Sequence, residues 1–78
     1  MQPEKKFRAG AICATIWKNT SEKNGSSSEY RTVSFERVYK DKTGNWQTTN
    51  SLRVNDLPRA SIVLSKAYEF LVLNEQQE

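Results

Sequence analysis

Three stretches in the first two thirds of the chain have the patterns of β-strands: residues 29–40 and 46–54 alternate hydrophobic and polar positions, whereas residues 7–18 are largely apolar or small on both faces, as in a strand covered on both sides. Each stretch is rich in β-branched, aromatic or small apolar residues. A period of two is the pattern of a β-strand, because successive side chains point to opposite faces of a sheet. A bend in the middle of the third stretch would separate a short fourth strand. The pattern predicts an antiparallel sheet of three to four strands over residues 7–54.

Polar segments separate the predicted strands. Residues 19–28 contain only Asn, Thr, Ser, Glu, Lys and Gly, and we expect a mobile loop there. Residues 41–45 are short enough for a tight hairpin turn, in which Gly44 supplies a positive φ. Residues 1–6 are mostly polar and contain a proline, so we expect a flexible arm before the sheet.

The hydrophobic period changes after the third stretch. Asn55 and Asp56 are residue types that cap helices, and Pro58 suits a first helical turn. A helix is therefore predicted over residues 56–74, followed by a polar tail at 75–78. At about 100° per residue, one broad apolar arc would pack on the sheet. This arc contains Leu57, Ala60, Val63, Leu64, Ala67, Tyr68, Phe70 and Leu71.

A second apolar strip lies on the opposite side of the predicted helix. Ile62 and Leu73 form this strip, between charged residues. One small sheet covers a single side of a helix, so the second strip predicts a partner, and a second copy of the chain would serve. The expected fold is one small α+β domain over residues 1–78, an antiparallel sheet followed by one C-terminal helix, in a homodimer. The expected dimer interface contains Ile62, Leu64, Tyr68, Leu71 and Leu73.

Composition excludes several classes of protein. The 78 residues include one cysteine, Cys13, and no histidine, so neither an intramolecular disulfide nor a structural zinc site is expected. The longest apolar run has four residues, far short of the roughly 20 that a membrane span needs, and we recognise no signal peptide after Met1. We expect a cytoplasmic protein, associated with the nucleoid if its source is a prokaryote.

The residue types of most enzyme active sites are missing as well. Without histidine, Cys13 and the serines have no conventional base, and a cysteine in an apolar strand is typical of an inert, packed thiol. No pair of carboxylates has a spacing that suggests acid–base catalysis, and the glycines are too isolated to form a phosphate-binding loop. We therefore expect a non-catalytic protein that binds no metal and no cofactor.

Charge is distributed unevenly along the chain. Residues 1–54 contain ten Lys or Arg and five Asp or Glu, a net charge of +5. Residues 55–78 contain two basic and four acidic residues, a net charge of −2, which leaves the whole chain at +3. A basic sheet region indicates a polyanionic partner, although +3 is also an ordinary solubility charge.

The segment from Tyr39 to Trp46 combines aromatic and basic residues. It is a predicted hairpin tip with an aromatic residue on each flank and Lys40 and Lys42 between them. Single-stranded nucleic acid is bound by this combination, since bases stack on aromatic rings and lysines contact phosphates. The alternative is structural. Tyr39 and Trp46 would then form a cross-strand aromatic pair, with Arg37 as a cation–π or salt-bridge partner beside them.

Three short motifs resemble those of a known family. They are Lys-Phe-Arg-Ala-Gly at 6–10, Tyr-Lys-Asp-Lys-Thr-Gly-Asn-Trp at 39–46 and Ser-Leu-Arg-Val-Asn at 51–55. In order and spacing they are similar to the first strand, the hairpin and the helix entry of the single-stranded-DNA-binding domain of the transcriptional coactivator positive cofactor four. The plant whirly proteins share a related fold. The resemblance covers residues 6–73.

This resemblance implies a homodimer whose helices pack between subunits and whose two sheets form grooves for single-stranded DNA. It also implies that Tyr39 stacks on bases and that Lys6, Arg8 and Lys42 occupy basic positions of the groove. The expected function is non-catalytic binding of single-stranded DNA, or of RNA, in transcription, replication or repair. The full set of candidate nucleic-acid-binding residues is Lys6, Arg8, Trp17, Lys18, Arg37, Tyr39, Lys40, Lys42, Trp46, Thr48, Asn50 and Arg53.

Two other functions are weighed against this one. The same fold would serve as a protein-interaction module that acts through its helix or through an exposed strand edge. Duplex DNA is disfavoured, because the one predicted helix is apolar and carries only Arg59 and Lys66 as basic residues, unlike a recognition helix.

Overall fold

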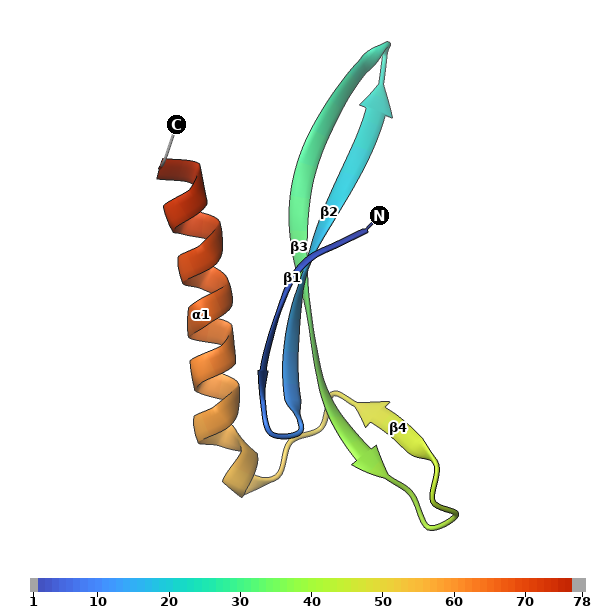
Figure 1. Ribbon diagram of the computed structural model, residues 1–78. Helices are drawn as coiled ribbons and strands as arrows, with labels where there is room; N and C mark the ends of the chain where they lie inside the picture. The colour runs from blue at the N-terminus through green and yellow to red at the C-terminus, as the bar shows by residue number, and fades with distance from the viewer. Residues whose placement is uncertain (1, 77–78) are drawn as a thin grey trace.

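The computed structural model describes residues 2–76 as a four-stranded antiparallel sheet followed by one C-terminal helix (Figure 1). The strands follow each other as neighbours in the order β1-β2-β3-β4, and a short 3-10 turn, η1, precedes the helix α1. The predicted α+β fold class is confirmed. The element bounds are β1 Gln2–Ala9, β2 Ile12–Lys23, β3 Ser26–Lys40, β4 Trp46–Thr49, η1 Val54–Asp56 and α1 Leu57–Gln76.

The first predicted strand is in fact two strands joined at Gly10. This glycine has a φ of +61°, a left-handed conformation that other L-residues avoid, and the chain reverses there. Residues 2–6, expected as a flexible arm, therefore belong to β1, which pairs with β2. The residues on both sides of Gly10 are largely apolar or small on both faces, so the sequence predicts one covered strand over residues 7–18 and does not reveal the turn.

The segment expected as a mobile loop at residues 19–28 is also different. Its two halves continue β2 and β3 as a paired ribbon, with Lys23 opposite Ser26. The turn between them consists of Asn24 and Gly25, both with positive φ (54° and 78°), as a two-residue type I′ hairpin requires. Backbone pairing holds this polar ribbon, which projects beyond the end of β1 (Figure 1).

The predicted third strand, over residues 46–54, is shorter in the structure, and the short fourth strand expected at its end does not form. β4 ends at Thr49, and the chain then runs irregularly to η1. Side chains rather than strand pairing hold this connection. The Asn50 amide donates to the Phe35 carbonyl oxygen, and Arg37 Nε donates to the Ser51 carbonyl oxygen over 3.1 Å. The sheet still has four strands, because β1 forms its edge opposite β4.

Helix α1 begins at Leu57, close to the predicted start, and Asp56 organises its entrance. The Asp56 side chain is 3% exposed and accepts a hydrogen bond from the Arg53 backbone N–H over 2.8 Å. Arg37 of β3 and Arg53 each place a guanidinium Nε near its carboxylate, at 3.4 and 3.5 Å. Asp56 therefore ties the start of the helix to the sheet.

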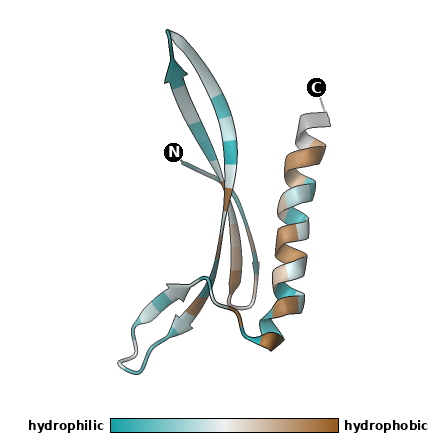
Figure 2. Cartoon of the chain, turned by 180° about the vertical axis from the view of Figure 1, so that it is seen from behind, coloured by the Kyte–Doolittle hydropathy of each residue, from teal (hydrophilic) through white to brown (hydrophobic). Residues whose placement is uncertain are grey.

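The core lies between β2 and one face of α1. Ile12, Ala14 and Ile16 are buried on β2, and Phe7 of β1 packs edge-on against Phe70 of the helix with ring centroids 6.3 Å apart. The helix contributes Ala60, Val63 and Ala67, with Phe70 and Leu71 partly buried beside them. Figure 2 shows the brown residues gathered on the helix and on the part of the sheet beside it.

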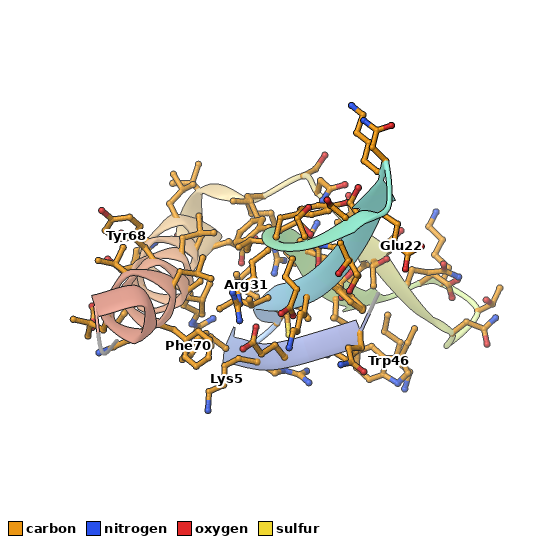
Figure 3. All side chains as sticks on the ribbon, turned by 90° about the horizontal axis from the view of Figure 1, so that it is seen from above. Lys5, Glu22, Arg31, Trp46, Tyr68 and Phe70 are labelled. Carbon is orange, nitrogen blue, oxygen red and sulfur yellow. The ribbon has the colours of Figure 1, made fainter. Side chains whose placement is uncertain are left out.

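The sheet covers a narrower arc of α1 than the sequence predicts. Leu57, Leu64 and Tyr68 belong to the predicted packing arc, but all three are exposed. At about 100° per residue they lie to one side of the buried Ala60, Val63 and Ala67. Tyr68 points away from the sheet in Figure 3, whereas Phe70 lies between the helix and β1. Within residues 2–76, no helix combines the length and apolarity that crossing a membrane requires.

Candidate nucleic-acid interface

The strand register divides the side chains of the sheet between two faces. Residues directly opposite each other in an antiparallel ladder project to the same side, so each face can be followed from strand to strand. One face packs on α1, and we call it the helix-facing face. We call the other the open face. From β1 to β4 the open face carries Lys6, Arg8, Cys13, Thr15, Trp17, Asn19, Tyr30, Thr32, Ser34, Glu36, Val38, Lys40, Trp46 and Thr48.

The twelve candidate residues do not lie together. Six of them share the open face, namely Lys6, Arg8, Trp17, Lys40, Trp46 and Thr48. Three project from the helix-facing face, namely Lys18, Arg37 and Tyr39. The remaining three, Lys42, Asn50 and Arg53, lie in the connections on either side of β4. The open face therefore holds the largest group.

The two hairpin aromatics lie on opposite faces. Tyr39 is opposite Gln47, while Trp46 is opposite Lys40, one position further along the ladder. The cation–π contacts follow the same division. The Arg37 guanidinium lies 5.4 Å from the Tyr39 ring centroid, and Lys40 Nζ lies 5.7 Å from that of Trp46. The alternative interpretation of a cross-strand pair between Tyr39 and Trp46 is therefore wrong, although Arg37 does act as a cation–π partner.

Three basic residues on the helix-facing face are paired with carboxylates, whereas Lys5, opposite Ile16, has no such partner within residues 2–73. Lys18 Nζ is 2.8 Å from Glu29, and Arg31 Nε is 2.7 Å from Glu4. The third pair is that of Arg37 with Asp56. The Arg31 hydrogen bond holds the pKa of Glu4 below its usual value, as expected for a carboxylate kept in its charged form. These cations are thus already neutralised by the fold.

Basic residues on the open face have no such partners. Within residues 2–73, no ion pair joins Lys6, Arg8 or Lys40 to a carboxylate. Arg8 Nε donates to the Gly10 carbonyl oxygen over 2.9 Å, which directs its side chain without reducing its charge. These three cations are available to an anionic ligand.

Aromatic rings on the open face differ in accessibility. Trp46 is 68% exposed, and Figure 3 places it on the side of the molecule away from α1. Tyr30 is 52% exposed. Trp17 is half-buried, and its indole N–H donates to Ser34 Oγ over 2.8 Å, which fixes the ring within the sheet. Trp46 and Tyr30 therefore offer more free ring surface than Trp17.

Asp41 organises the turn that carries Lys42. Its Oδ1 accepts hydrogen bonds from the backbone N–H groups of Thr43 and Asn45 and from the Thr43 hydroxyl, over 2.7–3.0 Å. Its Oδ2 accepts one from the Gln47 amide over 3.2 Å. The Thr43 hydroxyl is the main cause of the lowered pKa of Asp41, followed by the Asn45 backbone N–H. Gly44 has a φ of +87°, as the predicted turn requires.

The twelve candidates leave out part of the open face. Tyr30 is not among the twelve candidates, nor are the hydroxyl residues Thr32 and Ser34. The alternation of residues 29–40 already places all three on the face of Lys40. The sequence gives no indication that Tyr30 pairs with Asn19, because residues 19–28 are expected to form a loop.

Two candidates from the connections are engaged within the protein. The Asn50 amide is bound to Phe35, and Arg53 is bound to Asp56.

In the part of the chain that the structure describes, no group of three or more His, Cys, Asp or Glu side chains could hold a metal ion. Comparisons of the chain with protein-family models, with curated proteins and with solved structures find no match.

Proposed function

We propose that the protein binds single-stranded nucleic acid on the open face of its sheet, without catalysis, and that DNA is its main ligand. One observation carries this proposal: the unpaired cations Lys6, Arg8 and Lys40 share a face with the exposed ring of Trp46. Phosphates need unneutralised positive charge, and bases need accessible aromatic rings. The helix-facing face offers neither to the same extent.

The shape and charge of the molecule favour a single strand over a duplex. The sheet is strongly twisted along β2 and β3 (Figure 1), and a flexible single strand can follow a twisted surface. Bases in a duplex are stacked on each other and cannot stack on Trp46. Helix α1 does not suit a DNA groove, since its inner face packs on the sheet and Lys66 is paired with Glu69 at 3.6 Å.

We include a homodimer in the proposal, because one copy is extended and exposes much surface. The radius of gyration is 15.4 Å, whereas a compact domain of this length has about 11.5 Å. The accessible surface is 6106 Å², about 1,200 Å² more than the roughly 4,900 Å² of a compact monomer of 9.0 kDa. A standard interface buries about 800 Å² per partner, so a second copy would account for most of the excess.

The exposed apolar side chains of α1 are where the second copy would pack. Ile62, Leu64, Tyr68 and Leu73 are all exposed, in agreement with a role in the expected interface. Leu71 differs from the other expected interface residues, because it is partly buried against the core of its own chain. A different protein on the same helix is the alternative. Sedimentation tests the dimer directly: a compact 9 kDa monomer at high concentration would contradict it.

The test of binding compares two exposed aromatic residues on opposite faces. Fluorescence anisotropy would measure the affinity of a labelled oligo-dT for the wild type, Trp46→Ala and Tyr39→Ala, at two salt concentrations. We expect binding that weakens steeply with salt, a large loss for Trp46→Ala and a small one for Tyr39→Ala. Binding of a duplex should be weak. An oligo-dT affinity that is the same at both salt concentrations, or a loss of affinity confined to Tyr39→Ala, would overturn the assignment of the open face.

A further inference from the structure

Tyr30 lies at the opposite end of the open face from Trp46. It pairs with Asn19 in the polar ribbon formed by β2 and β3, whereas Trp46 pairs with Lys40 at the other end of β3. Its side chain is 52% exposed and lies outside the core. Among residues 2–73, no side-chain hydrogen bond or ring contact holds the Tyr30 ring. A large ring without a packing role in an otherwise polar ribbon calls for a ligand.

Between the two rings, hydroxyl groups line the face. Thr32 Oγ1 accepts a hydrogen bond from the Asn19 amide over 3.1 Å, and Ser34 Oγ accepts one from the Trp17 indole over 2.8 Å. A hydroxyl has one donor and two acceptor positions. Since both oxygens act here as acceptors, both O–H groups remain free to donate to phosphate or base oxygens. The surface between Trp46 and Tyr30 therefore includes two fixed donors near Tyr30, while Glu36 and Val38, nearer to Trp46, offer none.

We propose that Tyr30 is a second stacking site, and that a single strand lies along β3 from Trp46 to Tyr30. This inference rests on the proposed function and extends the ligand beyond the hairpin. Ten residues separate Lys40 from Tyr30 along β3, or about 33 Å at a rise of about 3.3 Å per residue. This length spans about ten nucleotides at the duplex spacing of about 3.4 Å, and fewer when the strand is stretched. Each chain thus holds one short strand.

The test is a length series of oligo-dT, from three to twelve nucleotides, measured with the wild type, Tyr30→Ala, Tyr30→Phe and Trp46→Ala. Wild-type affinity should rise with length and level off at ten nucleotides or fewer. Tyr30→Ala should bind three nucleotides as the wild type does but bind the longest oligonucleotides about 5- to 150-fold more weakly, the loss of one base stack. Tyr30→Phe should bind like the wild type, because stacking needs only the ring.

Different outcomes separate this inference from the proposed function. If Trp46→Ala weakens binding while Tyr30→Ala equals the wild type at every length, Tyr30 is not a stacking site and only the inference fails. If the wild type binds no oligo-dT at any length, the proposed function fails with it. Val33→Ala serves as the matched control, because Val33 lies on β3 between the two rings but on the helix-facing face. A loss as large in Val33→Ala would show that changes in β3 act through folding, and would overturn the inference.

Discussion

The two faces of the sheet use the same residue types for different purposes. On the helix-facing face, Lys18, Arg31 and Arg37 are each paired with a carboxylate, and the apolar residues pack on α1. On the open face, Lys6 and Lys40 have no carboxylate partner within residues 2–73. Net charge does not reveal this difference. What matters for a ligand is which cations the fold has already neutralised.

Burial also differs in origin between the faces. Ile12 and Ile16 are buried by the helix, whereas Cys13 and Thr15 are buried on the open face without any element above them. In the strand register, Cys13 lies between Arg8 of β1 and Glu36 of β3, and Thr15 lies between Lys6 and Ser34. Exposed groups of the open face therefore lie toward its edges, where a ligand would contact them.

The largest expected effect is on folding and belongs to the helix-facing face. Ile16 is fully buried in the core, so Ile16→Ala should lower the free energy of unfolding by about 2–5 kcal/mol, through lost burial and a residual cavity. Urea unfolding followed by circular dichroism would measure it. Thr48→Ala on the open face is the control and should change stability little, because the Thr48 side chain is exposed. Equal losses from the two variants would remove the distinction between the faces.

The second effect is on binding and belongs to the open face. The double variant Lys6→Gln, Lys40→Gln should lower oligo-dT affinity about 25-fold at 0.1 M salt and reduce the salt slope by about 1.4, since each phosphate contact contributes about 0.7. Unfolding should be unaffected. Lys18→Gln, which removes a cation already paired with Glu29, is the control. An equal reduction in slope from Lys18→Gln alone would show that paired cations bind as well as unpaired ones.

The third effect concerns the turn that separates β1 from β2. Gly10→Ala places a side chain at a φ of +61°, where its Cβ would lie 3.3 Å from Arg59 Nη1. We expect a loss of about 1–2 kcal/mol in stability, the usual cost of a left-handed conformation for an L-residue. Thermal unfolding would measure the change. Gly25→Ala is a comparison with open space around the Cβ, so it should cost only the backbone strain.

The fourth effect is a dependence of stability on pH through Asp56. The Arg53 backbone N–H is the main cause of its lowered pKa, and the two guanidinium groups add to it. A lowered pKa in the folded state gives stability that is present above the unfolded value of about 3.9 and lost as pH falls through the folded value. Urea unfolding at pH 2–6 should show a shallower acid loss in Asp56→Asn than in the wild type. Identical pH profiles would contradict this role.

The smallest expected effect is a gain. Glu36 is a carboxylate on the open face, opposite Cys13 and between the two ends of the proposed strand path. Glu36→Gln removes its repulsion of phosphates and should raise oligo-dT affinity by less than about fivefold, the scale of an exposed charge interaction. Anisotropy at low salt would detect the gain. Unchanged affinity across all salt concentrations would place the ligand away from Glu36.

Local sequence signals predicted the fold class and two of its elements, β3 and α1. The alternation of residues 29–40 and the capping residues before α1 are local signals, and both elements formed close to the expected bounds. The turn at Gly10 was not predicted, because residues on both sides of it are largely apolar or small and resemble one covered strand. Residues 19–28 were misread because backbone pairing across Asn24 and Gly25 holds a ribbon that has few apolar side chains.

The candidate site was harder to predict than the fold. Composition identified the hairpin aromatics, but only the register shows that Tyr39 and Trp46 lie on opposite faces. Pairing of cations depends on residues distant in sequence, such as Glu4 with Arg31, and no local pattern reports it. The alternation of residues 29–40 places Tyr30 on the face of Lys40, but the loop expected at residues 19–28 leaves it without a predicted neighbour.

The most direct measurement is photocrosslinking of the protein to oligo-dT that carries 5-bromouracil, followed by mass spectrometry of the modified peptides. Bromouracil reacts with aromatic side chains that stack on it, so the modified residue reports which face the ligand occupies. Binding on the open face predicts adducts at Trp46 and at Tyr30 and none at Tyr39. Adducts at Tyr39 alone, or a complete absence of adducts at micromolar protein, would contradict it.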